Sequence, residues 1–138
     1  MEDLLKKDKN IRFVLKEFPI LGPESVAASK VSDAFRKLAP EKYGDFHRAL
    51  LGSEGRATEA TAIEAAKSFG IKEPALRLEM AKSPDDASVK ATYQLATDLG
   101  LTGTPAYVIG NEAISGAIGI DALKEKIGNV RNCGKTSC

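Results

Sequence analysis

The feature that most constrains the fold of this chain is a long helical pattern enclosed by two short strand-like segments. Apolar residues recur at helical spacing between residues 24 and 100, whereas Ile11–Leu15 and Ala106–Ile109 are short runs rich in branched and aromatic residues. Such short apolar runs are typical of buried strands. The order strand, helical block, strand predicts one α/β domain with a helical subdomain inserted in it.

Prolines, glycines and capping residues divide the helical block into separate helices. A proline lacks the backbone donor that a helix interior needs, so the first helix should stop at Pro40. Thr58 or Thr61 can cap a later helix, which should close at Gly70. Ser83 is expected to start another, because a proline and two aspartates follow it and suit a helix N-terminus.

The two ends of the chain carry further elements. The charged segment Glu2–Lys9 looks like the last turns of a helix, and no capping residue precedes it, so we expect the beginning of that helix to lie before Met1. Gly110–Glu112 predicts a tight turn and Ala113–Ser115 the hairpin partner of the preceding strand. A final helix should be capped by Asp121 and end at Gly128.

Composition excludes several classes of protein. The chain has 138 residues, of which 43% are apolar and 28% charged, as in a globular domain. The formal net charge is +1 and aromatic residues are not interleaved with basic ones, so nucleic-acid binding is not expected. Membrane spans need about 18 or more apolar residues, and no run approaches that length. The acidic N-terminus is also unlike a signal peptide.

The chain has only two cysteines, Cys133 and Cys138, with four residues between them. This spacing fits a small structural disulfide loop in an oxidising compartment better than a zinc site, which usually takes four ligands and would find a single histidine, His47. A flexible thiol pair and a disulfide-exchanging pair remain alternatives. We expect His47 to be a packing residue, and we expect neither a metal nor a cofactor.

Three segments, taken together, resemble one protein family. They are Phe13–Pro23 (FVLKEFPILGP), Gly103–Gly110 (GTPAYVIG) and Gly116–Ile127. They are similar to the DsbA-like branch of the thioredoxin superfamily, in which a helical subdomain is inserted at about residues 24–100. The resemblance implies a single DsbA-like thioredoxin domain over residues 1–138, lacking the N-terminal strands and the start of the active-site helix.

The resemblance also implies where substrate binds. In this family a cis proline follows a residue whose backbone pairs with an extended substrate peptide, a form of strand addition. Gly103, Thr104 and Pro105 would be the substrate-binding residues here. A trans proline that simply begins a strand is the alternative.

The departure from the family concerns the catalytic residues. Family members carry Cys-X-X-Cys at the start of the active-site helix, where a thiolate attacks a disulfide. This chain has no catalytic residue of that kind, and the motif would lie before Met1. Trimming of a longer protein, a misassigned start and a natural redox-inactive variant all remain open. The missing strands predict either a homodimer formed by strand exchange or direct antiparallel pairing of Ile11–Leu15 with Ala106–Ile109.

The expected function is therefore thiol-disulfide exchange that forms or isomerises disulfides in exported proteins, with the redox motif missing from this chain. The alternatives are a redox-inactive peptide-binding thioredoxin-fold module and a glutathione-using DsbA-like transferase or isomerase. The implied partners are unfolded or extended polypeptides, without nucleic acid or a membrane span. The implied location is the periplasm or another exported compartment.

Overall fold

The computed structural model describes residues 2–83 and 85–138. Contacts between Cα atoms divide the chain into two compact units. The first, here called the α/β unit, contains the residues up to 16 together with residues 94–138. The second, here called the helical unit, is Glu17–Tyr93. The helical unit thus interrupts the α/β unit in sequence, and the expectation of one domain over residues 1–138 stays a prediction.

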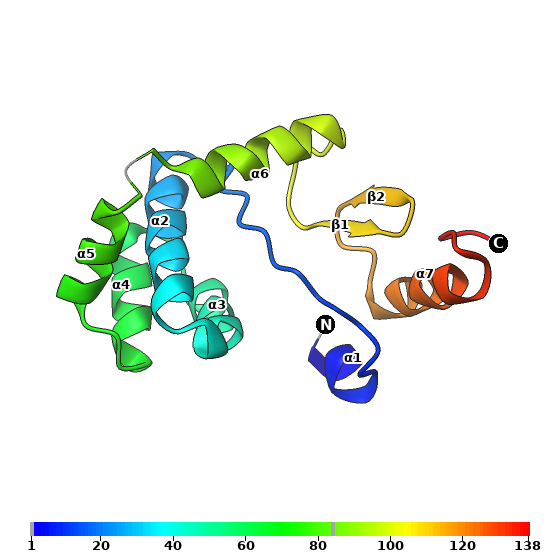
Figure 1. Cartoon of the computed structure of the whole chain (residues 1–138), viewed down its shortest axis with the longest axis horizontal. Helices are drawn as coiled ribbons and strands as arrows, with labels where there is room; N and C mark the ends of the chain where they lie inside the picture. The colour runs from blue at the N-terminus through cyan, green and yellow to red at the C-terminus, as the bar shows by residue number, and fades with distance from the viewer. Residues whose placement is uncertain (1, 84) are drawn as a thin grey trace. The chain divides into compact units, whose positions relative to one another are not determined.

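Helices account for the regular structure of the helical unit (Figure 1). In this unit α2 packs mainly against α4 and α5, and α6 continues past Tyr93 into the other unit. The elements are α2 (Pro23–Leu38), the 3₁₀ helix η1 (Pro40–Lys42), α3 (Tyr43–Gly52), α4 (Glu59–Ser68), α5 (Glu73–Ala81) and α6 (Ala87–Asp98).

An aromatic cluster forms the core of the helical unit. The rings of Phe35 and Phe46 stack with centroids 4.1 Å apart, and the edge of Phe69 lies against both. Phe35 and Phe46 are fully buried, as are Val31 and Leu76. Val31 and Phe35 lie four residues apart in α2, so they share one face of the helix and both point into this core.

Capping decides where α4 begins. Thr58 is the N-cap of α4, and its side chain and that of Thr61 bond reciprocally to the backbone, so both expected capping residues take part. The predicted start of α6 at Ser83 was wrong, because this helix begins at Ala87. Ser83 instead accepts a hydrogen bond from Lys37 at 2.9 Å, and Pro84 lies outside the described residues.

The α/β unit contains a β-hairpin, which is followed in the sequence by the last helix. Its elements are α1 (Glu2–Lys7), β1 (Ala106–Ile109), β2 (Glu112–Ser115) and α7 (Ile120–Cys133). The strands pair antiparallel, with Ile109 opposite Glu112 and Ala106 opposite Ser115. Gly110 in the turn has φ 53°, and a Cβ there would lie 2.7 Å from the side chain of Val130, so glycine is needed at this close approach.

The final helix differs from its prediction at both ends. Gly119 is the N-cap of α7 and Asp121 lies in the first turn. The helix passes through Gly128 and ends before Gly134, which takes the left-handed conformation at φ 79°. A glycine inside a helix costs about 1 kcal/mol relative to alanine but does not end it. The left-handed residue after the last turn marks the actual terminus.

The strand predicted at Ile11–Leu15 was wrong. Residues 11–20 contain no helix or strand, and the sheet of the described residues consists of β1 and β2 alone, so direct pairing with β1 does not occur either. Phe13 and Val14 are 42% and 55% exposed. A strand needs a neighbour to bond its backbone, and none lies beside this segment in the part of the chain that the structure describes.

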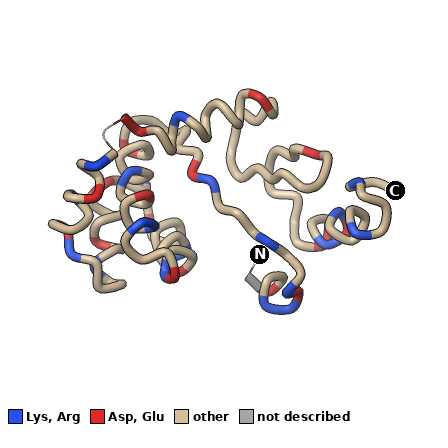
Figure 2. The backbone as a smooth tube through the Cα atoms, viewed as in Figure 1, with Lys and Arg blue, Asp and Glu red and all other residues tan. Residues whose placement is uncertain are grey.

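Surface charges of both signs are interspersed along the helices of both units (Figure 2). Arg77, for example, lies 3.0 Å from Glu59 and 2.8 Å from Glu73. Among the described residues, no helix is both long enough and apolar enough to cross a membrane.

Candidate peptide-binding site

The loop before β1 is open to solvent. Thr104 and Pro105 are exposed and Gly103 is partly exposed. The peptide bond between Thr104 and Pro105 is cis. No hydrogen bond from the backbone of Thr104 is found among the described residues. This residue therefore presents free polar backbone groups to an incoming chain.

The loop continues into an unpaired edge of β1. Gly116 donates its backbone N–H to the carbonyl of Pro105 at 2.8 Å, which fixes the phase of the hairpin ladder. Because bonding alternates along an antiparallel strand, Tyr107 and Ile109 turn their backbone groups toward β2. Ala106 and Val108 turn theirs to the opposite edge, where the described residues contain no third strand. An extended peptide could pair there.

The hairpin is supported by α7, which contacts β1. Ile114 of β2 and Leu123 of α7 are buried, at 8% and 4% exposure. Lys126 of α7 donates to Glu112 of β2 at 2.7 Å. This hydrogen bond lowers the pKa of Glu112, which keeps the carboxylate charged. The hairpin is thereby held on the helix.

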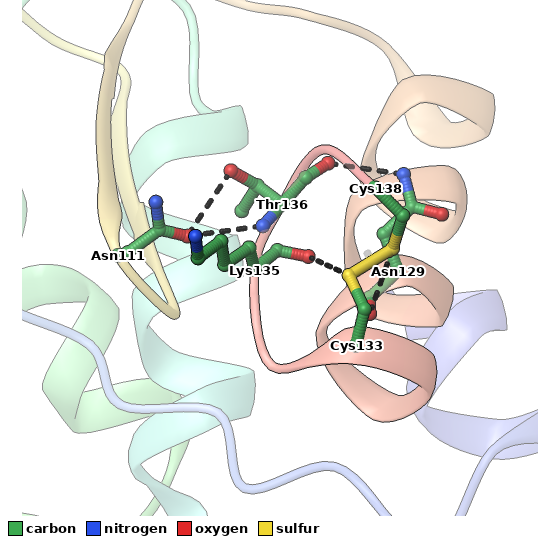
Figure 3. The surroundings of a disulfide bond; sticks show 6 residues. All are labelled: Asn111, Asn129, Cys133, Lys135, Thr136 and Cys138. Atoms are coloured by element: carbon green, nitrogen blue, oxygen red, sulfur yellow. Dashed lines mark hydrogen bonds between the residues drawn. A yellow bond between two sulfur atoms is a disulfide. The ribbon is translucent and has the colours of Figure 1, made fainter.

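Cys133 and Cys138 form a disulfide that closes a loop after α7 (Figure 3). Thr136 within this loop is 5% exposed and donates its backbone N–H to Oδ1 of Asn111 at 3.0 Å. The side chain of Asn129 donates to the carbonyl of Thr136 at 3.0 Å. The loop therefore joins the hairpin turn to the last turns of α7.

Sequence reasoning missed a polar cluster in the helical unit. One oxygen of Glu17 accepts from Ser32 at 2.8 Å and from Tyr43 at 2.6 Å, and it lies 3.2 Å from Nδ1 of His47. Burial raises the pKa of Glu17, but hydrogen bonds from the three partners outweigh burial and hold that pKa below its ordinary value. Burial and the Glu17 carboxylate raise the pKa of Tyr43.

This cluster fastens the segment that leads into the helical unit. Tyr93 of α6 adds a hydrogen bond from its hydroxyl to the carbonyl of Pro19 at 2.7 Å, and its ring meets that of Phe18 edge to face. His47 thus has a structural partner, Glu17, that its position on a helix did not reveal. The only local sign was an acidic residue inside an apolar segment, Phe13–Pro23.

The chemistry available to these residues is limited. Within residues 2–83 and 85–138, no group of three or more His, Cys, Asp and Glu side chains could hold a metal ion. Both cysteines are joined in the disulfide, and the sequence contains no Cys-X-X-Cys. The described residues therefore supply no free thiolate.

A helical subdomain inserted before a proline loop, a hairpin and a terminal helix defines a protein of the thioredoxin-like class. Comparison with known families narrows this class. The model of the DSBA-like thioredoxin domain matches residues 1–128, and the chain belongs to that family. Its fold is accordingly the DsbA-like thioredoxin fold, here mostly helical with a two-stranded sheet.

Solved structures support the same assignment. A thioredoxin-like oxidoreductase from Silicibacter pomeroyi DSS-3 is 31% identical, with a TM-score of 0.86 over 96% of this chain and 75% of that one. The thiol-disulfide exchange protein alpha-DsbA2 from Wolbachia pipientis is 30% identical, with a TM-score of 0.84 over 94% and 70%. Proteus mirabilis ScsC, at 22% identity and a TM-score of 0.77 over 97% and 73%, shares the fold. The comparison with curated proteins found no match for the sequence.

Proposed function

We propose that this chain binds extended polypeptides for thiol-disulfide exchange, with Thr104 and Pro105 at the centre of the binding edge and Gly103 beside them. The observation that carries the proposal is the exposed loop that runs into the unpaired edge of β1. Membership of a family of disulfide oxidoreductases supports it. The attacking thiolate would come from a Cys-X-X-Cys outside these 138 residues.

The same proposal includes an oxidising, exported location such as the periplasm. Disulfides persist in such compartments and are rare in the cytosol, so the bond between Cys133 and Cys138 favours it. We assign this bond a structural role. In a test of insulin reduction by dithiothreitol, the chain should be no faster than its Cys133→Ser/Cys138→Ser variant. A clear rate advantage would instead make the tail pair redox-active.

Binding is tested with a pair of variants at Thr104. Thr104→Pro removes the backbone N–H, whereas Thr104→Ala keeps it. Binding of fluorescent, reduced and carboxamidomethylated ribonuclease A, measured by anisotropy, should weaken about fivefold in Thr104→Pro, the effect of losing roughly one hydrogen bond. Thr104→Ala should bind like the parent. Equal binding by all three proteins would exclude pairing at this edge.

A second copy of the chain is a competing occupant of the β1 edge. The unpaired, half-exposed Phe13 and Val14 favour a homodimer in which Ile11–Leu15 of one copy pairs with β1 of another. Light scattering over a concentration series tests this idea, with Val14→Lys expected to return any dimer to monomer because a buried charge opposes pairing. A parent chain that is monomeric at all concentrations would rule out the dimer.

A further inference from the structure

The disulfide loop after α7 touches the hairpin at one defined place. Thr136 is buried although it lies in a short loop between exposed residues, and its partner is Asn111 in the β1–β2 turn. Both the backbone N–H and the hydroxyl of Thr136 point to Oδ1 of Asn111, at 3.0 and 3.4 Å (Figure 3). A polar group buried in this way is costly unless its bonds are kept.

The covalent bond keeps those hydrogen bonds in place. Gly134 ends α7 in the left-handed conformation and turns the chain back, and Cys138 is then tied to Cys133 in the last turn of the helix. A closed loop of this size has few alternative conformations, so the position of Thr136 is restricted. If the bond opens, only non-covalent contacts remain to hold the loop, among them the hydrogen bonds of Thr136 with Asn129, Asn111 and Glu112.

The contact then extends along the hairpin to the peptide-binding edge. Gly110 and Asn111 form the turn between the strands, and Ile109 and Glu112 on either side of it are the first pair of the ladder. At the far end of the same ladder, Gly116 bonds to the carbonyl of Pro105. If the turn frays at Asn111, the ladder between the two strands weakens, and β1, which begins at Ala106 next to Pro105, is held less firmly.

We propose that the Cys133–Cys138 disulfide is a redox-dependent brace, acting through Thr136 and Asn111, that positions β1 for peptide binding. The proposal rests on the peptide-binding function argued above. Thr136 and Asn111 are positioning residues, since neither belongs to the binding edge itself. The open form of the brace binds extended peptide less tightly than the closed form.

The opening reaction is ordinary thiol-disulfide exchange with a dithiol reductant. A thiolate of the dithiol attacks one protein sulfur, the protein S–S bond breaks, and the displaced sulfur takes a proton. The second thiol of the reagent then displaces the remaining protein sulfur as its own disulfide closes. Two electrons and two protons pass to Cys133 and Cys138, both of which are exposed to reagent.

Hydrogen exchange on the oxidised chain and the dithiothreitol-reduced chain tests the brace directly. Reduction should speed exchange of the amides of Tyr107, Ile109 and Ile114, while amides of α2 in the helical unit stay protected. The α2 signal shows that the protein remains folded. Unchanged exchange in the hairpin after reduction would overturn the brace, whatever the peptide-binding result.

Binding of the same carboxamidomethylated ribonuclease A separates the brace from the proposed function. In oxidised protein, Asn111→Ala should bind about fivefold more weakly because both contacts from Thr136 to Oδ1 are lost. Asn111→Asp should restore binding because its carboxylate still accepts from Thr136. Asn132→Ala on the exposed side of α7 is the control. A looser hairpin with unaltered affinity overturns the positioning role. A looser hairpin in a chain that binds no probe in either state supports the brace and removes the peptide-binding function.

Discussion

The helical unit and the α/β unit differ in whether they contain large side chains that are fully buried. The largest fully buried side chains all lie in the helical unit: Phe35, Phe46, Leu76, Val31 and Ser32. In the α/β unit, Leu4, Ile114 and Leu123 retain 4–8% exposure. Exposed apolar side chains do not distinguish the two units, since Phe13, Val14 and Val108 are 42–56% exposed in the α/β unit and Leu21, Leu51 and Leu78 are 63–71% exposed in the helical unit.

The difference follows from where each kind of element finds its hydrogen bonds. A helix satisfies its backbone internally and needs neighbours only for its apolar face. A strand needs another strand for its backbone as well, so Ile11–Leu15 stays irregular and β1 keeps an open edge. The helical unit is thus expected to provide stability and the α/β unit binding capacity.

The largest effect should come from the aromatic core of the helical unit. Phe46→Ala removes a fully buried ring that stacks on Phe35, so the free energy of unfolding should fall by about 3–5 kcal/mol. Urea unfolding followed by circular dichroism measures this loss. The control is Leu51→Ala in the same helix, where the side chain is 63% exposed and the change should stay below about 0.5 kcal/mol. Equal losses would mean that the stacked rings are not the core.

The corresponding change in the α/β unit should be smaller. Ile114→Ala removes an 8% exposed side chain of β2, and we expect a loss of about 2 kcal/mol, the low end for such substitutions, because fewer buried neighbours surround it. Hydrogen exchange should show the loss at β1 and β2, with α2 unaffected. Val108→Ala, at the exposed edge, is the matched control. A loss as large as that of Phe46→Ala would abolish the contrast between the units.

Acid should weaken the polar cluster of Glu17, Ser32, Tyr43 and His47. Because the folded pKa of Glu17 lies below its ordinary value of 4.5, the carboxylate contributes stability that is fully present above pH 4.5 and is lost as the pH falls through the folded pKa. At pH 7, Glu17→Gln should destabilise the chain by about 2 kcal/mol, the range for hydrogen bonds to a charged group.

The same substitution provides its own pH test. The difference between Glu17→Gln and the parent should shrink between pH 5 and pH 3, since the parent carboxyl becomes neutral as well. Urea midpoints at each pH measure it, and Glu41→Gln in the exposed η1 is the control. A difference that stays constant with pH would mean that the charge of Glu17 contributes nothing.

Local signals in the sequence were sufficient for the presence of the helices and the hairpin, although they misplaced the start of α6 and both ends of α7. The Thr58–Thr61 cap, the stop at Pro40 and the turn at Gly110 depend on residues close together in sequence, and all three occur. Strand formation at Ile11–Leu15 depends on a partner strand elsewhere, so the strand-like composition of this segment led to a wrong prediction. The Glu17 cluster is assembled by tertiary packing of α2 and α3 on the preceding segment, which no spacing in the sequence encodes.

The smallest effect is expected at the N-cap of a single helix in the helical unit. Thr58→Ala removes the side-chain oxygen that caps α4, which should cost about 1 kcal/mol. Thr58→Ser keeps a hydroxyl in the same place and should restore nearly all of it. Exchange of the first-turn amides of α4, together with the urea midpoint, measures both variants. Because α4 packs on α2, a loss confined to that first turn would show that the helical unit tolerates fraying at one helix end. A loss spread over α2 as well would show that cap and core unfold together.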